Sequence, residues 1–451
     1  MSGQSAARQD IVAGKNIEGA KMRVVRGEVR DGFGEIVGSG LVVNDDGELV
    51  EVLTGPGESG ESSLLGEAGV TSELVGAFIV PGLVDVHCHG GGGASFPDDL
   101  DEESIRAAIA AHRGGGTTAL VASLVSMIDP LPAIRALVPF CRSGELAGIH
   151  MEGPFVSPHK AGAQNPAAIR GGDLAELESW LEAGDGWIRT MTVAPETENA
   201  VEVAQMLLRY GAKPSWGHTA TDGATTAAVL AATLEYAAEI GFDGVPQTAT
   251  HLFNAMPAIN HREPGPIREL IQGARRGEVS IELIGDGVHL APILVEDVAE
   301  YVGGSGAGGT GGSGAGQLGS SGTGQAARLS TILVTDAMAA AGMPEGNYQL
   351  GGLDVEVKDG AARLAGKDTI AGGCSRLAEQ VAFLAGRGTL DLGQLVRATV
   401  AGPVRAASLL RPGREASGVT LTFEPGTKPN FLVLDSQHRV VEVVREGVTV
   451  G

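Results

Sequence analysis

Short apolar runs alternate with amphipathic stretches through the middle of the chain. The runs are bounded by Gly, Pro and charged residues and contain many Val, Ile and Thr residues, which is typical of strands. The stretches between them are rich in Ala, Leu and Glu and indicate helices, for example at 103–113, 199–211 and 225–240. Strands that alternate with helices predict a parallel sheet, and this pattern predicts an α/β fold, a TIM-like (β/α)8 barrel. The expected strands lie at 83–89, 118–126, 146–152, 188–196, 213–218, 247–254, 279–289 and 329–337.

The two ends of the chain share a different pattern. Short β-type runs separated by Gly and Asp turns occur at 22–53 and again at 418–450. Similar patterns at both ends suggest that they fold together. We therefore expect residues 1–77 and 401–451 to form one small β domain, of the sandwich type, flanking a barrel at 78–400.

Two segments look inserted into this arrangement. Residues 55–73 are expected to form a loop of the β domain. Residues 303–325 consist mainly of Gly and Ser and are expected to be flexible. Because this second segment leads into the eighth strand from the barrel face opposite the catalytic mouth, we expect no catalytic role for it.

The composition excludes some partners. The formal net charge of the 451 residues is −23, from 55 acidic and 32 basic residues, which argues against nucleic acid or an anionic membrane as partner. The three cysteines are widely separated without CxxC spacing, so no disulfide framework is expected. The N-terminal MSGQSAARQD lacks an apolar signal core, and no apolar run approaches the ~20 residues that span a membrane. We therefore expect a cytoplasmic protein.

Polar side chains close several of the expected strands. Barrel enzymes carry their catalytic residues at the carboxyl ends of the strands, so these side chains should meet at one face. Imidazole nitrogens with a carboxylate suit a divalent ion that activates water; zinc fits best, and manganese, cobalt or iron also fit, with one or two ions for each chain. The pattern predicts a metal-dependent hydrolase. The residues are His87, His89, Glu152, His218, His251 and Asp336.

The positions of these residues suggest different roles. His87 and His89 are two apart on a strand and face the same side, whereas Cys88 faces away and is expected to be a core thiol. His150 faces the same way as Glu152 but lies deeper, which favours packing. Asp336 is either a ligand or the group that takes a proton from water and delivers it to a leaving amine. No role is expected for His112, His159 and His438.

A second set of residues suits an anion. His261 and Arg262 follow the sixth strand, and His289 follows the seventh. A guanidinium group matches the geometry of phosphate oxygens, although Arg262 could instead pair with Glu263. The glycines in 369–375 offer backbone N–H groups near such a ligand.

The motifs DVHCHGGGG, HMEGPFVSP, WGHT, THLFNAM, REPG, DGVH, LVTDAM and TIAGG occur in this order. Together they resemble the N-acetylglucosamine-6-phosphate deacetylases of the amidohydrolase superfamily, over nearly the whole chain except the two inserted segments. The resemblance implies hydrolysis of N-acetylglucosamine 6-phosphate to glucosamine 6-phosphate and acetate, and a homodimer with His289 near its interface. No lysine ends the fourth strand, where many relatives carry a carboxylated lysine, and Glu152 looks like its replacement.

The resemblance also implies roles for single residues. Glu152, His218 and His251 would hold the principal ion, and the pair at 87 and 89 would help to hold a second. Asp336 would be the general base and acid. Gln164 stands where many members have a histidine, and an amide cannot become cationic. The sugar phosphate would be held by Ala163, Gln164, Asn254, Ala255, Arg262, His289, Ile370, Ala371 and Gly372.

Other classes of enzyme have similar metal ligands. The ligands alone also fit an N-acyl amino acid deacylase, a cyclic-amide hydrolase or an adenine-type deaminase. Arg262 and His289 separate these alternatives, since a phosphate site serves a sugar phosphate better. A barrel that has lost catalysis and acts as a scaffold would be expected to lack ligands, and here all of them are present.

Overall fold

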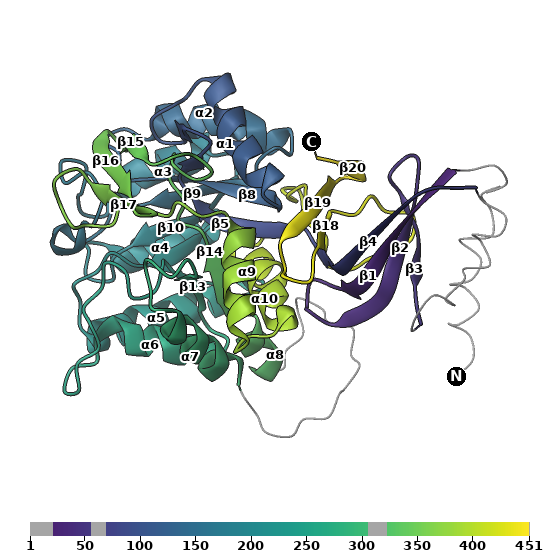
Figure 1. Ribbon diagram of the computed structural model, residues 1–451. Coiled ribbons are helices and arrows are strands. Elements are labelled where there is room, and N and C mark those ends of the chain that lie inside the picture. Colours follow the sequence, from purple (N-terminus) through teal and green to yellow (C-terminus); the bar gives the residue numbers. More distant parts are fainter. Residues whose placement is uncertain (1–20, 56–68, 305–322, 451) are drawn as a thin grey trace.

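The barrel expected from the sequence is present in the structure, a computed structural model that describes residues 21–55, 69–304 and 323–450. Eight parallel strands form one sheet, and helices cover its outside (Figure 1). Every residue of these eight strands is buried, because side chains fill the barrel on one face of the sheet and meet helices on the other. The strands are β5 (Leu83–Cys88), β8 (Thr117–Leu124), β9 (Gly148–Glu152), β10 (Ile188–Val193), β11 (Lys213–Trp216), β12 (Thr248–Ala249), β13 (Ser280–Ile284) and β14 (Thr331–Val334).

Helices connect these strands in the order that the sequence predicts. Asp101, Asp173 and Asp222 cap the amino ends of α1, α3 and α5, where each carboxylate accepts a hydrogen bond from a backbone N–H of the first turn. The helices are α1 (Glu102–Gly114), α2 (Leu131–Arg142), α3 (Leu174–Ala183), α4 (Ala200–Arg209), α5 (Gly223–Glu239), α6 (Gly265–Arg275), α7 (Pro292–Gly303), α8 (Thr323–Arg328), α9 (Leu377–Arg387), α10 (Leu392–Thr399) and α11 (Ala401–Ala406).

The seam between β5 and β14 closes the barrel through a buried carboxylate. The side chain of Asp85 accepts hydrogen bonds from the Thr335 hydroxyl at 2.5 Å, from the Thr335 N–H at 3.3 Å and from the His87 N–H at 3.2 Å. The Asp336 N–H donates to the His87 carbonyl at 2.9 Å. Burial raises the pKa of Asp85 to about 6. These bonds hold the ends of the first and last strands together, next to the expected metal ligands.

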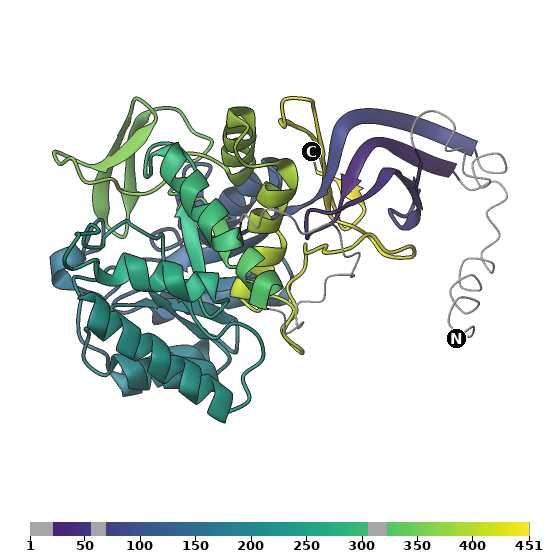
Figure 2. The same ribbon diagram turned by 90° about the horizontal axis from the view of Figure 1, so that it is seen from below.

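Both chain ends contribute to a second sheet, as the sequence predicts. Its strand order is β20-β19-β18-β4-β1-β2-β3, so the C-terminal strands continue directly from the N-terminal ones. In Figure 2 this sheet lies beside the barrel. The strands are β1 (Lys21–Arg30), β2 (Ile36–Asn44), β3 (Leu49–Leu53), β4 (Gly69–Pro81), β18 (Phe431–Leu434), β19 (Val440–Arg445) and β20 (Val448–Thr449).

Four details differ from the expectation. β4 begins at Gly69, so the loop expected at 55–73 ends earlier, because the chain there pairs with β1. The sixth barrel strand contains only Thr248–Ala249, since the chain turns before His251. A small sheet that the sequence pattern did not predict follows β14 and consists of β15 (Gly346–Leu350), β16 (Leu353–Lys358) and β17 (Ala361–Leu364). Two strands of two residues each, β6 (Gly90–Gly91) and β7 (Ala94–Ser95), follow β5 and pair with each other.

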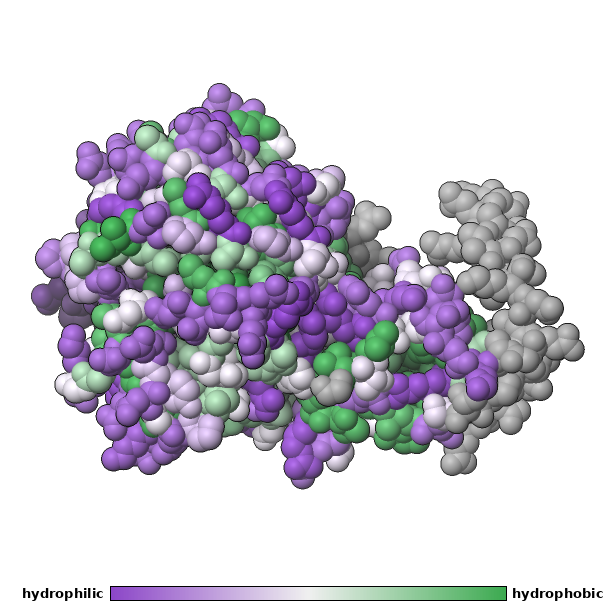
Figure 3. All heavy atoms as spheres, turned by 90° about the horizontal axis from the view of Figure 1, so that it is seen from above, coloured by the Kyte–Doolittle hydropathy of each residue, from purple (hydrophilic) through white to green (hydrophobic). Residues whose placement is uncertain are grey.

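Other expectations on organisation stay predictions. The domain boundaries at 77/78 and 400/401 are not tested by these contacts. Most of the 303–325 segment lies outside the described residues. Hydrophilic side chains cover much of the face seen in Figure 3, with hydrophobic ones scattered among them. Within the described part of the chain, no helix is both long and apolar enough to cross a membrane.

The buried bonds of Asp85 give a test of barrel closure. Asp85→Ala removes the acceptor shared by three buried donors, and only the Thr335 hydroxyl has a second acceptor, the His87 carbonyl at 3.4 Å. We therefore expect the free energy of unfolding to fall by roughly 3 kcal/mol. Asp173→Ala removes only the cap of α3 and should cost about 1 kcal/mol. Denaturant unfolding followed by circular dichroism measures both. Equal losses in the two variants would contradict a special role of Asp85.

Candidate metal centre

Six polar side chains from the carboxyl ends of five barrel strands meet inside the barrel mouth. In each of two groups, the possible ligand atoms lie within 4.8 Å of one another. They converge because all parallel strands of a barrel end at the same face. One group consists of His87, His89 and Asp336, and the other of Glu152, His218 and His251.

The backbone leaves the strand conformation where three of these residues lie. The φ angle is +47° at His218, +24° at His251 and +48° at Asp336. Residues other than glycine rarely adopt such angles, and each costs of order 1–3 kcal/mol. Strain of this kind is retained where the direction of a side chain matters, which supports a functional role for the three turns.

The carboxylate of Glu152 joins the two groups. Its Oε1 atom lies 2.9 Å from Nε2 of His218 and 2.8 Å from Nε2 of His251. Its Oε2 atom lies 3.2 Å from Nε2 of His89. The carboxylate therefore contacts histidines of both groups and connects them.

The nitrogen atoms within each group also face one another. Nε2 of His218 lies 3.1 Å from Nε2 of His251, and Nε2 of His87 lies 3.1 Å from Nε2 of His89. A neutral imidazole nitrogen carries either one proton or one lone pair, so one proton cannot satisfy two facing nitrogens and a carboxylate together. A divalent cation satisfies such converging donors, and this mixture of nitrogen and oxygen donors fits an ion of the zinc type.

Two of the histidines are fixed by contacts of their second nitrogen. Nδ1 of His218 donates to the Lys160 carbonyl at 2.9 Å. Nδ1 of His87 lies 2.9 Å from a carboxylate oxygen of Glu282. Both contacts favour the proton on Nδ1, which leaves the lone pair of Nε2 directed at the site.

The charges of the site stabilise one another. Burial alone would raise the pKa of Glu152, but His218, His251 and His89 hold it well below its usual range. Burial opposes the charged form of Asp336 in the same way, and His87 and His89 hold its pKa well below the usual range. Both carboxyl groups are therefore ionised and act as acceptors rather than donors.

His150 lies beside the ligands and has other partners. Its Nδ1 atom lies 3.0 Å from the Ser123 hydroxyl and its Nε2 atom 2.9 Å from the Thr192 hydroxyl. Burial, with a smaller contribution from His87, holds its pKa well below the usual range. Both nitrogens are used within the barrel, in agreement with the expected packing role.

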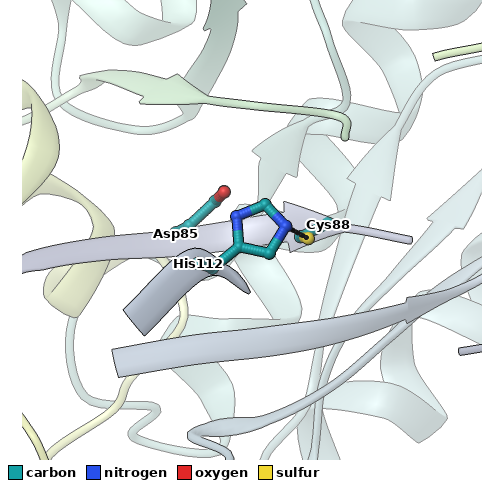
Figure 4. Close-up of side chains that lie close together, drawn as sticks. All are labelled: Asp85, Cys88 and His112. Atoms are coloured by element: carbon teal, nitrogen blue, oxygen red, sulfur yellow. Dashed lines mark hydrogen bonds between the residues drawn. The ribbon is translucent and has the colours of Figure 1, made fainter. Parts of the chain in front are cut away.

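Cys88 faces the outside of β5, as its position between two ligands predicts. Its sulfur lies 3.2 Å from Nε2 of His112 in α1, with Asp85 nearby (Figure 4). Nε2 of His112 also lies 2.8 Å from the Gly90 carbonyl. This third group of possible donors lies behind β5 and not in the barrel mouth.

A cavity of about 340 Å³ opens onto the metal ligands. It contains all the expected substrate-binding residues except Arg262. The turns after β9 and β12 supply one wall, and the segment 368–372 supplies another. The expected residues in its lining are Ala163, Gln164, Asn254, Ala255, His289, Ile370, Ala371 and Gly372.

The expected contact of Arg262 with this cavity is absent within one chain. Its side chain is exposed, and among the described residues it has no hydrogen bond or ion pair. The alternative pairing with Glu263 is also not formed, since Oε1 of Glu263 accepts from the Gly223 N–H at 3.1 Å. The turn after β12 carries Arg262 away from the ligands of its own chain.

His289 reaches the cavity with a partner that the sequence did not reveal. Nδ1 of His289 lies 2.8 Å from Oδ2 of Asp286, and its Nε2 atom lies 3.9 Å from Oδ2 of Asp336. Burial opposes its charged form, but Asp286 raises the pKa of His289 above its usual value. His289 therefore lies next to the candidate catalytic carboxylate.

Gln164 also takes a position that the sequence did not predict. Its Nε2 atom donates to Oε2 of Glu152 at 2.6 Å, and its Oε1 atom accepts from the Ser126 N–H at 2.5 Å. The amide thereby orients the carboxylate of Glu152. Glu282, another residue that was missed, could have been noticed as an acid within the apolar run VSIELI.

A model of the amidohydrolase family matches residues 78–450. The chain belongs to the amidohydrolase family. All six candidate ligands lie within the matched region. The assignment agrees with a barrel that carries a metal centre at the carboxyl ends of its strands.

Similar proteins within the family are named as deacetylases of amino sugar phosphates. The chain is 31% identical to N-acetylglucosamine-6-phosphate deacetylase of Bacillus subtilis (strain 168) over 356 residues. This alignment covers 76% of this chain and 78% of the Bacillus protein. It is 27% identical to N-acetylgalactosamine-6-phosphate deacetylase of Escherichia coli O157:H7, over 82% and 86% of the two chains. The resemblance found in the sequence is confirmed.

A solved structure of this amidohydrolase family agrees with the fold. A mutant of N-acetyl-D-glucosamine-6-phosphate deacetylase from Mycobacterium smegmatis, in complex with N-acetyl-D-glucosamine-6-phosphate, superimposes with a TM-score of 0.77. It is 32% identical and covers 96% of this chain and 99% of that chain. The likeness therefore includes both the barrel and the terminal sheet.

Two substitutions distinguish a metal ligand from a packed histidine. An asparagine amide matches the Nδ1 side of an imidazole but does not reach the position of Nε2. His218→Asn should therefore keep the bond to Lys160 and lose about one bound ion per chain, measured by elemental analysis after dialysis. His150→Asn keeps its bond to Ser123 and should retain the ions. Wild-type metal content in His218→Asn would show that His218 is not a ligand.

Proposed function

We propose that this amidohydrolase removes the acetyl group of N-acetylglucosamine 6-phosphate, giving glucosamine 6-phosphate and acetate, in amino sugar catabolism or recycling. The observation that carries the proposal is the direction of the ionised Asp336 carboxylate. Its Oδ1 atom lies 3.2 Å from Nε2 of both His87 and His89, and Asp336 lines a cavity of about 340 Å³. This volume is in the range of small-molecule sites. The deacetylases from Bacillus and Mycobacterium support the choice of substrate.

We further propose that the site holds one or two divalent ions, with zinc as the best fit. Glu152, His218 and His251 would hold the principal ion, and His87 with His89 would help to hold the second, with Asp336 close to both histidines. When bound, such an ion acts as a Lewis acid, which polarises a carbonyl group and lowers the pKa of bound water toward ~7. Manganese, cobalt and iron fit the same donors.

The proton transfers are assigned to Asp336. Its pKa is held well below the usual range, so it is ionised at neutral pH and can accept a proton from the attacking water. Hydrolysis forms a C–O bond and breaks the amide C–N bond, so the leaving nitrogen needs a proton. Asp336 faces the cavity and can return the proton to that nitrogen. One carboxylate thereby serves as base and then as acid.

The remaining cavity residues would position the sugar. The Nε2 atom of His289 points toward Asp336 and has no hydrogen-bond partner among the described residues, so it is free to donate to substrate. The backbone at 370–372 lines the same cavity. Gln164 is engaged with Glu152, so its part in binding would be indirect.

A permanent cation, arginine in particular, matches the charge and the geometry of a phosphate group. Among the described residues, the lining contains neither lysine nor arginine. We propose a homodimer in which the exposed Arg262 serves a phosphate bound near the interface, with His289 close by. In such an assembly the exposure of Arg262 within one chain would be explained by its role toward the partner. The three cysteines are free, in keeping with the cytoplasmic location that we propose.

Other reactions of the amidohydrolase family are less well supported. An acyl amino acid deacylase, a cyclic-amide hydrolase or a deaminase would need the same ions, but similarity over most of the chain is to sugar-phosphate deacetylases. A scaffold without catalysis is disfavoured by the complete ligand set. The Escherichia coli relative is named for N-acetylgalactosamine 6-phosphate, so the assay should compare this epimer with N-acetylglucosamine 6-phosphate.

The role of Asp336 is tested by the isosteric amide. Asp336→Asn keeps the shape of the side chain but removes the proton acceptor, so we expect kcat to fall by at least ~100-fold. KM should change little, and metal content, measured in the same preparation, should stay at the wild-type level. Turnover close to that of the wild type would refute the proposed base.

The phosphate preference is tested by comparing N-acetylglucosamine with and without its 6-phosphate. A charge-assisted contact contributes about 1.5–3 kcal/mol, so we expect kcat/KM to be ~10–100-fold lower without the phosphate. Equal values would favour one of the alternative amidohydrolase reactions.

The same comparison defines the part of Arg262. Arg262→Ala should raise KM for the phosphorylated sugar by ~10-fold and leave the unphosphorylated sugar unaffected. Arg268→Ala is a matched control, since Arg268 is also exposed but pairs with Glu269 at 2.7 Å. An unchanged KM in Arg262→Ala would show that another group binds the phosphate.

A further inference from the structure

We propose that Glu282 is a positioning residue that holds both halves of the metal centre in one geometry. The inference rests on the metal site described above and not on the identity of the substrate. Glu282 belongs to neither group of ligands, and the family comparison does not assign it a role. Its carboxylate lies directly behind the ligands.

A single oxygen atom of Glu282 contacts one residue of each group. Oε2 lies 2.9 Å from Nδ1 of His87 and accepts a hydrogen bond from the His251 N–H at 3.0 Å. His87 belongs to the group with Asp336, and His251 to the group with Glu152. A displacement of this oxygen therefore disturbs both groups at once.

The contact with His87 selects the form of the ring that can bind a metal. With its proton on Nδ1 and shared with Glu282, the ring directs the lone pair of Nε2 at the site. The carboxylate also increases the electron density on the ring, which strengthens Nε2 as a ligand. Glu282 is 2% exposed, so water competes little for this bond.

The contact with His251 fixes a strained turn. The φ angle of His251 is +24°, where a side chain other than that of glycine is unfavourable. The His251 N–H binds the carboxylate of Glu282, and the next N–H, that of Leu252, donates to the Glu282 carbonyl at 2.8 Å. The side chain and the backbone of one residue thus hold the turn that directs His251 at Glu152.

The surroundings of Glu282 point to the metal centre and to no other role. Among the described residues, the carboxylate of Glu282 forms an ion pair with His87 and with no lysine or arginine. A buried carboxylate without a permanent cation is costly. The cost is offset when His87 is held between this carboxylate and a bound ion.

The test measures metal binding alone, with Co²⁺ added to the apoprotein of the full chain. In Glu282→Gln the amide oxygen still accepts both hydrogen bonds but the charge is lost, so we expect the Kd of the more weakly bound ion to rise by about tenfold. In Glu282→Ala both bonds are lost, and we expect a rise of about 100-fold. The absorption bands of bound Co²⁺ should shift in both variants, which a merely structural role would not produce.

Glu296→Gln is the matched control. Glu296 is a carboxylate in α7 that is 1% exposed and pairs with Arg387, far from the ligands in the sequence and outside both groups. Its Kd for Co²⁺ and its spectrum should equal those of the wild type. Unchanged Kd values and spectra in both Glu282 variants would overturn the proposal. If the alanine variant does not fold, the glutamine variant decides alone, and an unchanged Kd there overturns the proposal.

This outcome is independent of the proposed deacetylation. Wild-type protein that binds Co²⁺ but does not hydrolyse N-acetylglucosamine 6-phosphate would contradict the proposed function and leave the positioning role intact. If the wild-type protein hydrolyses N-acetylglucosamine 6-phosphate and the Glu282 variants bind Co²⁺ as the wild type does, the proposed function is supported and the positioning role is contradicted.

Discussion

The rest of the site depends on the buried carboxylate of Glu152. Its two oxygens face histidines of different groups, at 2.8–2.9 Å on one side and 3.2 Å on the other. An isolated buried charge is costly, and it is stable here only because several cationic or metal-binding partners converge on it. These partners come from strands far apart in the sequence, so their convergence requires a rigid frame. The barrel supplies that frame.

The frame acts through the carboxyl ends of the strands and the turns that follow them. His218, His251 and Asp336 lie in such turns with positive φ angles, and each turn is held by neighbouring backbone. At the seam between β5 and β14, Asp85 binds Thr335 and the backbone of His87. The bonds that close the barrel thus also fix the first and last ligands. Stability and site geometry depend on the same contacts.

Local sequence was sufficient to predict much of this arrangement. The spacing of His87 and His89 predicted a shared face with Cys88 behind it, because side chains alternate along a strand. The ends of the apolar runs located the ligands, because all strands of a barrel end at the same face. Glu282 and the β15–β17 sheet were missed, since their roles arise from contacts between distant segments. The run at 247–254 resembles a strand, but the structure turns there because Glu282 binds the His251 and Leu252 N–H groups. Tertiary contacts overrode the pattern.

Two histidines at or near the cavity are paired with carboxylates. His87 is paired with Glu282 and His289 with Asp286, so neither imidazole adds a net positive charge when its partner is counted. The described lining has no lysine or arginine, and the whole chain carries a charge of −23. An anionic sugar would therefore be repelled by the protein field. The divalent ions that we propose would offset this repulsion, and so would the guanidinium group of Arg262 in the proposed dimer. Binding of the proposed substrate would then depend on metal loading and on assembly.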